Sequence, residues 1–239
     1  MSPEDSAKTE SAKTPRHFDQ ELDELRGLLL RMAGRAEEQL RAALAAVKRL
    51  DAQSANQTIM ADRGVDALEL EIEELAINLL ARRQPMAGDL RTLVAVLKIS
   101  NDLERVGDHA VNIAQCAKRL AEAYPMPQPS ELDEMAELST GMLRDAIGAF
   151  IERDVALARN VCLRDDEVDR CNDIVFRLML SQVAENTNRL IPALQMMLVA
   201  RNLERVADLA TNLGEDVIYI VEARTIKHHV ENVEGEYDQ

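Results

Sequence analysis

The chain has 239 residues, enough for one large domain or two modest ones, and its formal net charge is -15. Such an acidic chain repels nucleic acid phosphates, so we expect no direct DNA or RNA ligand. Only three Phe, three Tyr and nine Gly are present, with no Trp, and this balance favours helices over sheets. We therefore expect an all-α fold.

The number and spacing of the cysteines and the hydropathy of the chain indicate the cellular compartment of the protein. The three cysteines are odd in number and form no CxxC pair, which favours reduced thiols. No apolar run approaches the roughly 18 to 20 residues that span a bilayer, and the polar N-terminus lacks a hydrophobic signal segment. We expect a cytoplasmic protein that reaches membranes only through partners.

The chain order predicts two groups of three helices. Residues 1–15 are small and polar and should form a disordered tail. A Pro-rich linker over 124–130 should separate two domains, 16–123 and 131–230, and an acidic tail over 231–239 should follow them. Asp51, Asp154 and the turn at Pro85 should interrupt the helices. The expected helices span 17–50, 55–83, 89–123, 131–153, 155–185 and 191–225.

The two halves of the chain are related by duplication. Residues 99–115 and 199–215 agree at seven of seventeen positions. Earlier in each half, an offset of 103 residues matches Asp51 to Asp154 and Val65 to Val168. The repeat therefore covers whole three-helix units, and it predicts two tandem antiparallel three-helix bundles.

Each predicted bundle carries two rows of carboxylates beside its apolar stripe. Residues four apart lie on one side of a helix, so Glu104, Asp108 and Asn112 form one row. Counting outward from the turn at Pro85 puts this row level with a second row on the preceding helix. The second row comprises Asp62, Asp66, Glu69 and Glu73, and the other half has Asp165, Asp169, Asn172, Glu204, Asp208 and Asn212.

Carboxylates this close repel one another unless a cation neutralises them. Oxygen ligands suit Mg, Ca, Mn or iron, so the rows predict a metal site in each bundle. Local ion pairs of Arg105 with Asp108 and of Arg205 with Asp208 are the simpler alternative.

Three segments, QPMAGDLR at 84–91, DLERVGDHAVNIA at 102–114 and RNLERVADLATNLGEDV at 201–217, resemble the PhoU family of phosphate-transport accessory proteins. The resemblance implies a regulator, often a homodimer, that restrains phosphate uptake and represses phosphate-starvation signalling. It implies two partners, the ATPase of the phosphate-specific ABC transporter (PstB) and a membrane sensor histidine kinase (PhoR). It also implies bound iron, zinc, manganese or magnesium, as single ions or multinuclear clusters.

The resemblance assigns ligands residue by residue. The second motif has Leu209 where the family usually has His and where the first motif has His109, which puts the strength of the second site in doubt. Glu69, Asn112, Asn172, Asn212 and His109 are additional candidates. The implied ligands are Asp62, Asp66, Glu104, Asp108, Asp165, Asp169, Glu204 and Asp208.

Two other classes of protein compete with this interpretation. A metal-free helical scaffold would leave the carboxylates solvated. A ferritin-like di-iron protein needs inward-facing Glu-x-x-His pairs, and no histidine of the chain has Glu three residues before it. No nucleophile–base pair or phosphate-binding Gly loop is evident, so we expect no enzyme.

Overall fold

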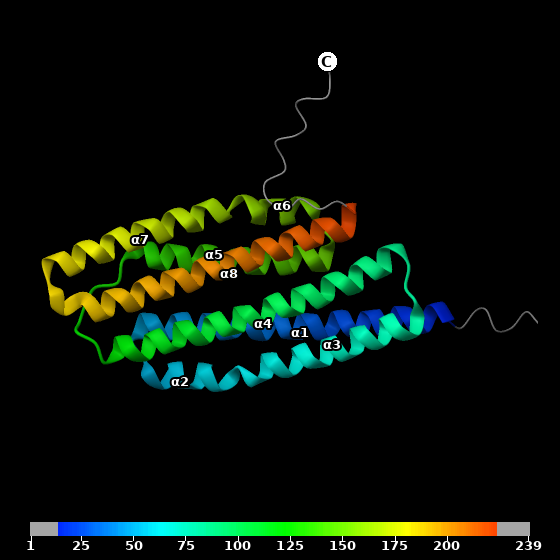
Figure 1. Cartoon of the computed structure of the whole chain (residues 1–239), viewed down its shortest axis with the longest axis horizontal. Helices are drawn as coiled ribbons and strands as arrows, with labels where there is room; N and C mark the ends of the chain where they lie inside the picture. The colour runs from blue at the N-terminus through cyan, green and yellow to red at the C-terminus, as the bar shows by residue number, and fades with distance from the viewer. Residues whose placement is uncertain (1–13, 224–239) are drawn as a thin grey trace, which may run out of the picture.

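The computed structural model describes residues 14–223, which form helices and no strands. The first half contains four helices and the second half four helices with a short 3₁₀ turn (Figure 1). Their bounds are α1 Thr14–Arg49, α2 Ala52–Ala61, α3 Arg63–Arg83, α4 Ala87–Ala121, α5 Ser130–Glu152, α6 Val155–Leu163, α7 Asp165–Glu185, η1 Thr187–Arg189 and α8 Leu190–Glu222.

Each half is a three-helix bundle, because α2 and α3 follow one another along one edge, as do α6 and α7 (Figure 1). The predicted fold class is therefore confirmed. Helix α1 begins at Thr14, so the last two residues of the predicted tail are helical. The rest of that tail and the predicted acidic tail at 231–239 lie outside the described residues. None of the described helices is long and apolar enough to cross a membrane.

The repeated helix ends have local causes. Leu50 and Arg153, which occupy equivalent positions, both have a φ of 52° and end their helices in the left-handed conformation. The next residue then caps the following helix. Asp51 accepts hydrogen bonds from the backbone of Gln53 and Ser54, and Asp154 accepts one from Leu157. These caps lie where the sequence predicted breaks.

One prediction about the helices was wrong, because each second helix is two helices. At Asp62 the backbone tightens, and Val65 donates to the Asp62 carbonyl at 2.8 Å, three residues back. Arg35 of α1 donates to the Gly64 carbonyl at 3.0 Å and so competes for it with the helix itself. In the second half the same change occurs at Arg164.

The two bundles pack against each other through α4 and α8. These helices are antiparallel, because Lys98 pairs with Asp216 at 2.9 Å while Arg119, further along α4, reaches back to Gln195 at 3.4 Å. Around these contacts lies a continuous apolar core, in which Leu103 and Leu203 are at most 1% exposed. The core leaves the outer faces of α4 and α8 for polar residues.

Candidate metal centre

Five carboxylates gather where α3 meets α4. Asp62, Asp66 and Glu69 come from the α2–α3 break and the first turns of α3, and Glu104 and Asp108 come from α4. Glu104 and Asp62 are half-buried, while Asp66 and Asp108 are exposed. The group, hereafter the first cluster, therefore opens to solvent on the outer face of the bundle. Its members are those that counting along the helices had predicted to face each other.

Burial and the neighbouring negative charges raise the pKa values of two carboxyl groups in the first cluster. The pKa of Glu104 rises to about 7, chiefly because the side chain is buried, and also because the carboxylates of Asp108, Glu69, Asp66 and Asp62 repel its charge. Burial and then the charges of Asp62 and Asp108 raise the pKa of Asp66. The site therefore holds excess negative charge that a cation would stabilise.

The second cluster has the same plan in the other bundle. Asp165 and Asp169 lie at the start of α7, close to Glu204 and Asp208 of α8. Burial, Asp208 and Asp169 raise the pKa of Asp165 to about 6. Asp169 also has a raised pKa, caused by burial and then by Glu204 and Asp208. Both halves thus repeat the register as well as the residues.

Arginines distinguish the two clusters. In the second cluster, Arg201 pairs with Glu204 at 2.5 Å and Arg205 with Asp208 at 2.8 Å, as predicted for Asp208. The alternative pair of Arg105 with Asp108 is not formed, because Arg105 contacts Asp102 at 3.3 Å, three residues before it. Local ion pairing therefore offsets part of the charge of the second cluster and leaves Asp108 of the first without its predicted arginine.

The additional candidates lie in different surroundings. Asn172 donates to Glu204 and belongs to the second cluster. Asn112 is exposed. Asn212 lines a polar pocket between α4 and α8 with Lys98 and Asp216. His109 contacts Asn202 of the other bundle through Nδ1 at 2.9 Å.

The orientation of Asn202 identifies the donor in the His109 contact. Its Nδ2 donates to the Leu198 carbonyl at 2.7 Å, so its Oδ1 accepts from Nδ1–H of His109. The histidine beside Asp108 thus joins the two bundles.

Gln39 of α1 was missed by the sequence interpretation. Its Nε2 donates to Asp62 Oδ1 at 2.9 Å, so a third helix contributes to the first cluster. The available signal was a polar residue on the apolar stripe of α1, at the position where the repeat has the buried Met142.

The residue types in the two clusters suit a cation, but their side chains do not yet form a metal site. No three His, Cys, Asp or Glu side chains in residues 14–223 are arranged so that they could hold a metal ion as they stand. Carboxylates of like charge repel one another when no cation lies between them, and every carboxylate of the two clusters is at least partly exposed to solvent. The fit therefore rests on oxygen donors in register on neighbouring helices.

Fold and site together define a class: an all-helical protein of two duplicated bundles, each with facing carboxylate pairs. The family model described as "PhoU domain" matches residues 29–117 and again 132–217. The chain belongs to the PhoU family.

Curated relatives and solved structures agree with this assignment. The chain is 36% identical over 204 residues to a protein of Xylella fastidiosa, with 85% of each chain covered. It is 39% identical over 203 residues to one of Caulobacter vibrioides, covering 84% of this chain and 88% of the relative. Both are named "Phosphate-specific transport system accessory protein PhoU homolog". The crystal structure of PhoU from Pseudomonas aeruginosa has a TM-score of 0.84 at 34% identity, covering 87% of this chain and all of that one.

Proposed function

We propose that this protein is a cytoplasmic accessory protein of phosphate transport that restrains phosphate uptake and represses phosphate-starvation signalling when phosphate is plentiful. The observation that carries the proposal is the similarity to relatives named for the phosphate-specific transport system, which extends over both bundles. The partners would be the transporter ATPase and the sensor histidine kinase, and a homodimer would be the working form.

We further propose that both acidic clusters bind divalent or trivalent cations, with Asp62, Asp66, Glu104 and Asp108 as ligands in the first. The raised pKa of Glu104 is consistent with this, because burial and then repulsion by the neighbouring carboxylates raise it, and a positive charge at the site would relieve that repulsion. A bound cation would supply positive charge on the outer face of each bundle. The ligands of the second cluster would be Asp165, Asp169, Glu204 and Asp208.

A deletion strain tests the regulatory role. Cells without this protein should express a phosphate-starvation reporter in phosphate-rich medium, and the full chain supplied from a plasmid should silence it. A reporter that stays silent in the deletion strain would contradict the proposal. A pull-down from phosphate-replete cells, with metal analysis of the same sample, would identify the partners and the native metal.

A cluster variant tests metal binding. Replacing Asp62, Asp66 and Asp108 by Asn and Glu104 by Gln should remove roughly half of the bound metal, because the second cluster keeps its own ligands. Metal analysis of purified protein measures this ratio. Unchanged stoichiometry would exclude the first cluster, and absence of metal in the unmodified protein would favour the metal-free scaffold.

A further inference from the structure

The first cluster contains a buried amide whose oxygen has no partner. Gln39 is only 5% exposed. Its Nε2 donates to Asp62, but its buried Oε1 has no hydrogen-bond partner among the described residues. A buried acceptor without a partner destabilises the folded state, so such oxygens in folded proteins usually face a ligand, an ion or water.

A glycine on α4 leaves room for this oxygen and for the Asp62 carboxylate. A Cβ at Gly107 would lie 3.3 Å from Asp62 Oδ1 and 3.4 Å from Gln39 Oε1. Gly107 also lies between Glu104 and Asp108 in sequence. The carboxamide of α1 and the carboxylate at the α2–α3 break therefore meet against the α4 backbone, on the helix that carries the other ligands.

The second bundle lacks both features of this arrangement. Met142 and Ala207 occupy the positions of Gln39 and Gly107, and both are fully buried. The second bundle therefore has a thioether and a methyl group where the first has an amide oxygen and space for it. This difference lies on the side of each cluster that faces α1 or α5.

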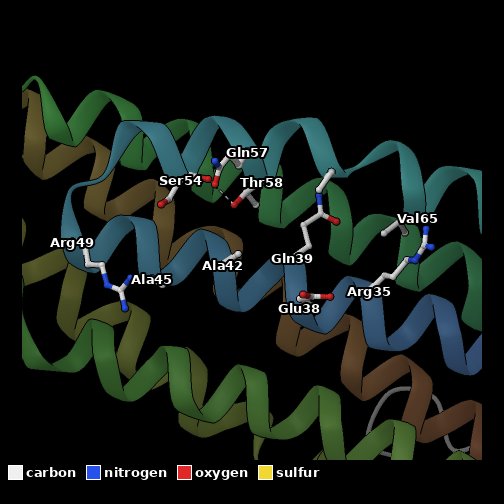
Figure 2. A pocket seen from close by; sticks show the side chains of 11 residues that line it. Arg35, Glu38, Gln39, Ala42, Ala45, Arg49, Ser54, Gln57, Thr58 and Val65 are labelled. Atoms are coloured by element: carbon white, nitrogen blue, oxygen red, sulfur yellow. Dashed lines mark hydrogen bonds between the residues drawn. The ribbon is translucent and has the colours of Figure 1, made fainter.

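A groove between α1 and α2 reaches Gln39 from solvent. It has a volume of about 530 Å³ and is lined by Gln39, Ala42, Gln57 and Ala61 among others. Figure 2 shows the Gln39 side chain extending from α1 toward the ribbon of the neighbouring helix. In the second bundle, the positions of Ala42 and Ala61 are occupied by Asp145 and Arg164. These two form an ion pair at 2.5 Å where the first bundle has the groove.

We propose that Oε1 of Gln39 is a ligand of the cation in the first cluster, which makes this a three-helix site with one neutral ligand. The inference rests on the proposed binding of metal by the clusters. Amide oxygens are common ligands of hard cations such as Mn²⁺, Mg²⁺ and Ca²⁺. The second cluster has no equivalent ligand, so the two sites of one chain differ in affinity.

Titration of the metal-free full chain with Mn²⁺, following free Mn²⁺ by electron paramagnetic resonance, tests the proposal. Gln39→Met, which installs the residue of the second bundle, should weaken about half of the sites roughly tenfold and leave the others unchanged. Gln39→Glu, which keeps an oxygen there, should retain affinity. Gln57→Met, the same change at an exposed position of the same groove, is the matched control and should alter neither class of site.

Each outcome decides between the two proposals. Unchanged Mn²⁺ affinity in Gln39→Met would overturn the ligand role while leaving metal binding by the clusters intact. Loss of affinity in both Gln39→Met and Gln39→Glu would mean that Gln39 acts only by donating to Asp62, and it would also overturn the ligand role. No Mn²⁺ binding by the unmodified chain would overturn both proposals. Circular dichroism of each variant checks that the helices are kept.

Discussion

Glu104 connects the electrostatics of the first cluster to stability. Its pKa of about 7 in the folded protein lies above the ordinary value of 4.5, so folding favours its protonated form. Ionised Glu104 therefore destabilises the metal-free protein above about pH 7. As the pH falls from 7 toward 4.5, the folded state takes up a proton before the unfolded state does, and stability rises.

Glu104→Gln should therefore stabilise the metal-free protein at pH 8 by about 1 kcal/mol, a figure reduced because the side chain is only half-buried. The gain should shrink by pH 5, where Glu104 is neutral in the folded protein. Chemical denaturation with a chelator at both pH values measures it. Glu71→Gln, at an exposed position of α3, is the control, and an equal effect in both variants would contradict the explanation.

At the scale of helices, the caps after α1 and α5 determine where the chain turns. Asp154 accepts a hydrogen bond from the Leu157 backbone at 3.0 Å and begins α6. Asp154→Ala should lower the free energy of unfolding by about 1 kcal/mol, because the donor at the helix start loses its partner. Asp154→Asn keeps an acceptor oxygen and should lose much less. Denaturation midpoints that are equal in the two variants would rule out the capping role.

The sequence predicted helices and their order from local signals. Pro85, the Pro-rich linker and the aspartates at 51 and 154 act within a few residues of themselves, so pattern reasoning found the turns there. Equal helical rise on both sides of each turn was enough to align the carboxylate rows.

The missed features depend on contacts between distant segments. The α2–α3 break involves Arg35 binding a carbonyl 29 residues away, and Gln39 reaches Asp62 over 23 residues. Asp102 and Asp108 both lie three residues from Arg105 on the same helix, and Arg105 contacts Asp102. Periodicity shows which side of a helix a residue occupies but not which of two equal neighbours it contacts.

At the scale of the whole molecule, a partly buried ion pair joins the two bundles. Lys98 of α4 donates to Asp216 of α8, whose side chain is 9% exposed, while Lys98 itself is 45% exposed. The hydrogen bond from Lys98 to Asp216 raises the pKa of Lys98, so Lys98 stays charged across the neutral range. Its loss would leave a carboxylate buried between the bundles without its cation.

Lys98→Met should therefore lower the free energy of unfolding by about 2 kcal/mol, less than for a fully buried pair because Lys98 is partly solvated. Lys48→Met provides the comparison, since it breaks the exposed inter-bundle pair with Asp133 and should cost no more than about 0.5 kcal/mol. Urea denaturation of both variants measures the difference. A Lys98→Met variant as stable as Lys48→Met would show that the buried pair is not needed to join the bundles.

The antiparallel packing of α4 on α8 relates the two halves of a single chain by an approximate two-fold axis. The helix pair is joined by the contacts of Lys98 with Asp216 and of Arg119 with Gln195. Glu104 and Glu204 lie on opposite sides of the axis. The two acidic clusters therefore occupy equivalent places in the two halves of one chain. Gln39 and His109 of the first half correspond by position to Met142 and Leu209 of the second. Because Gln39, Met142 and Leu209 are buried, the symmetry is broken mainly inside the molecule, beneath the two acidic faces.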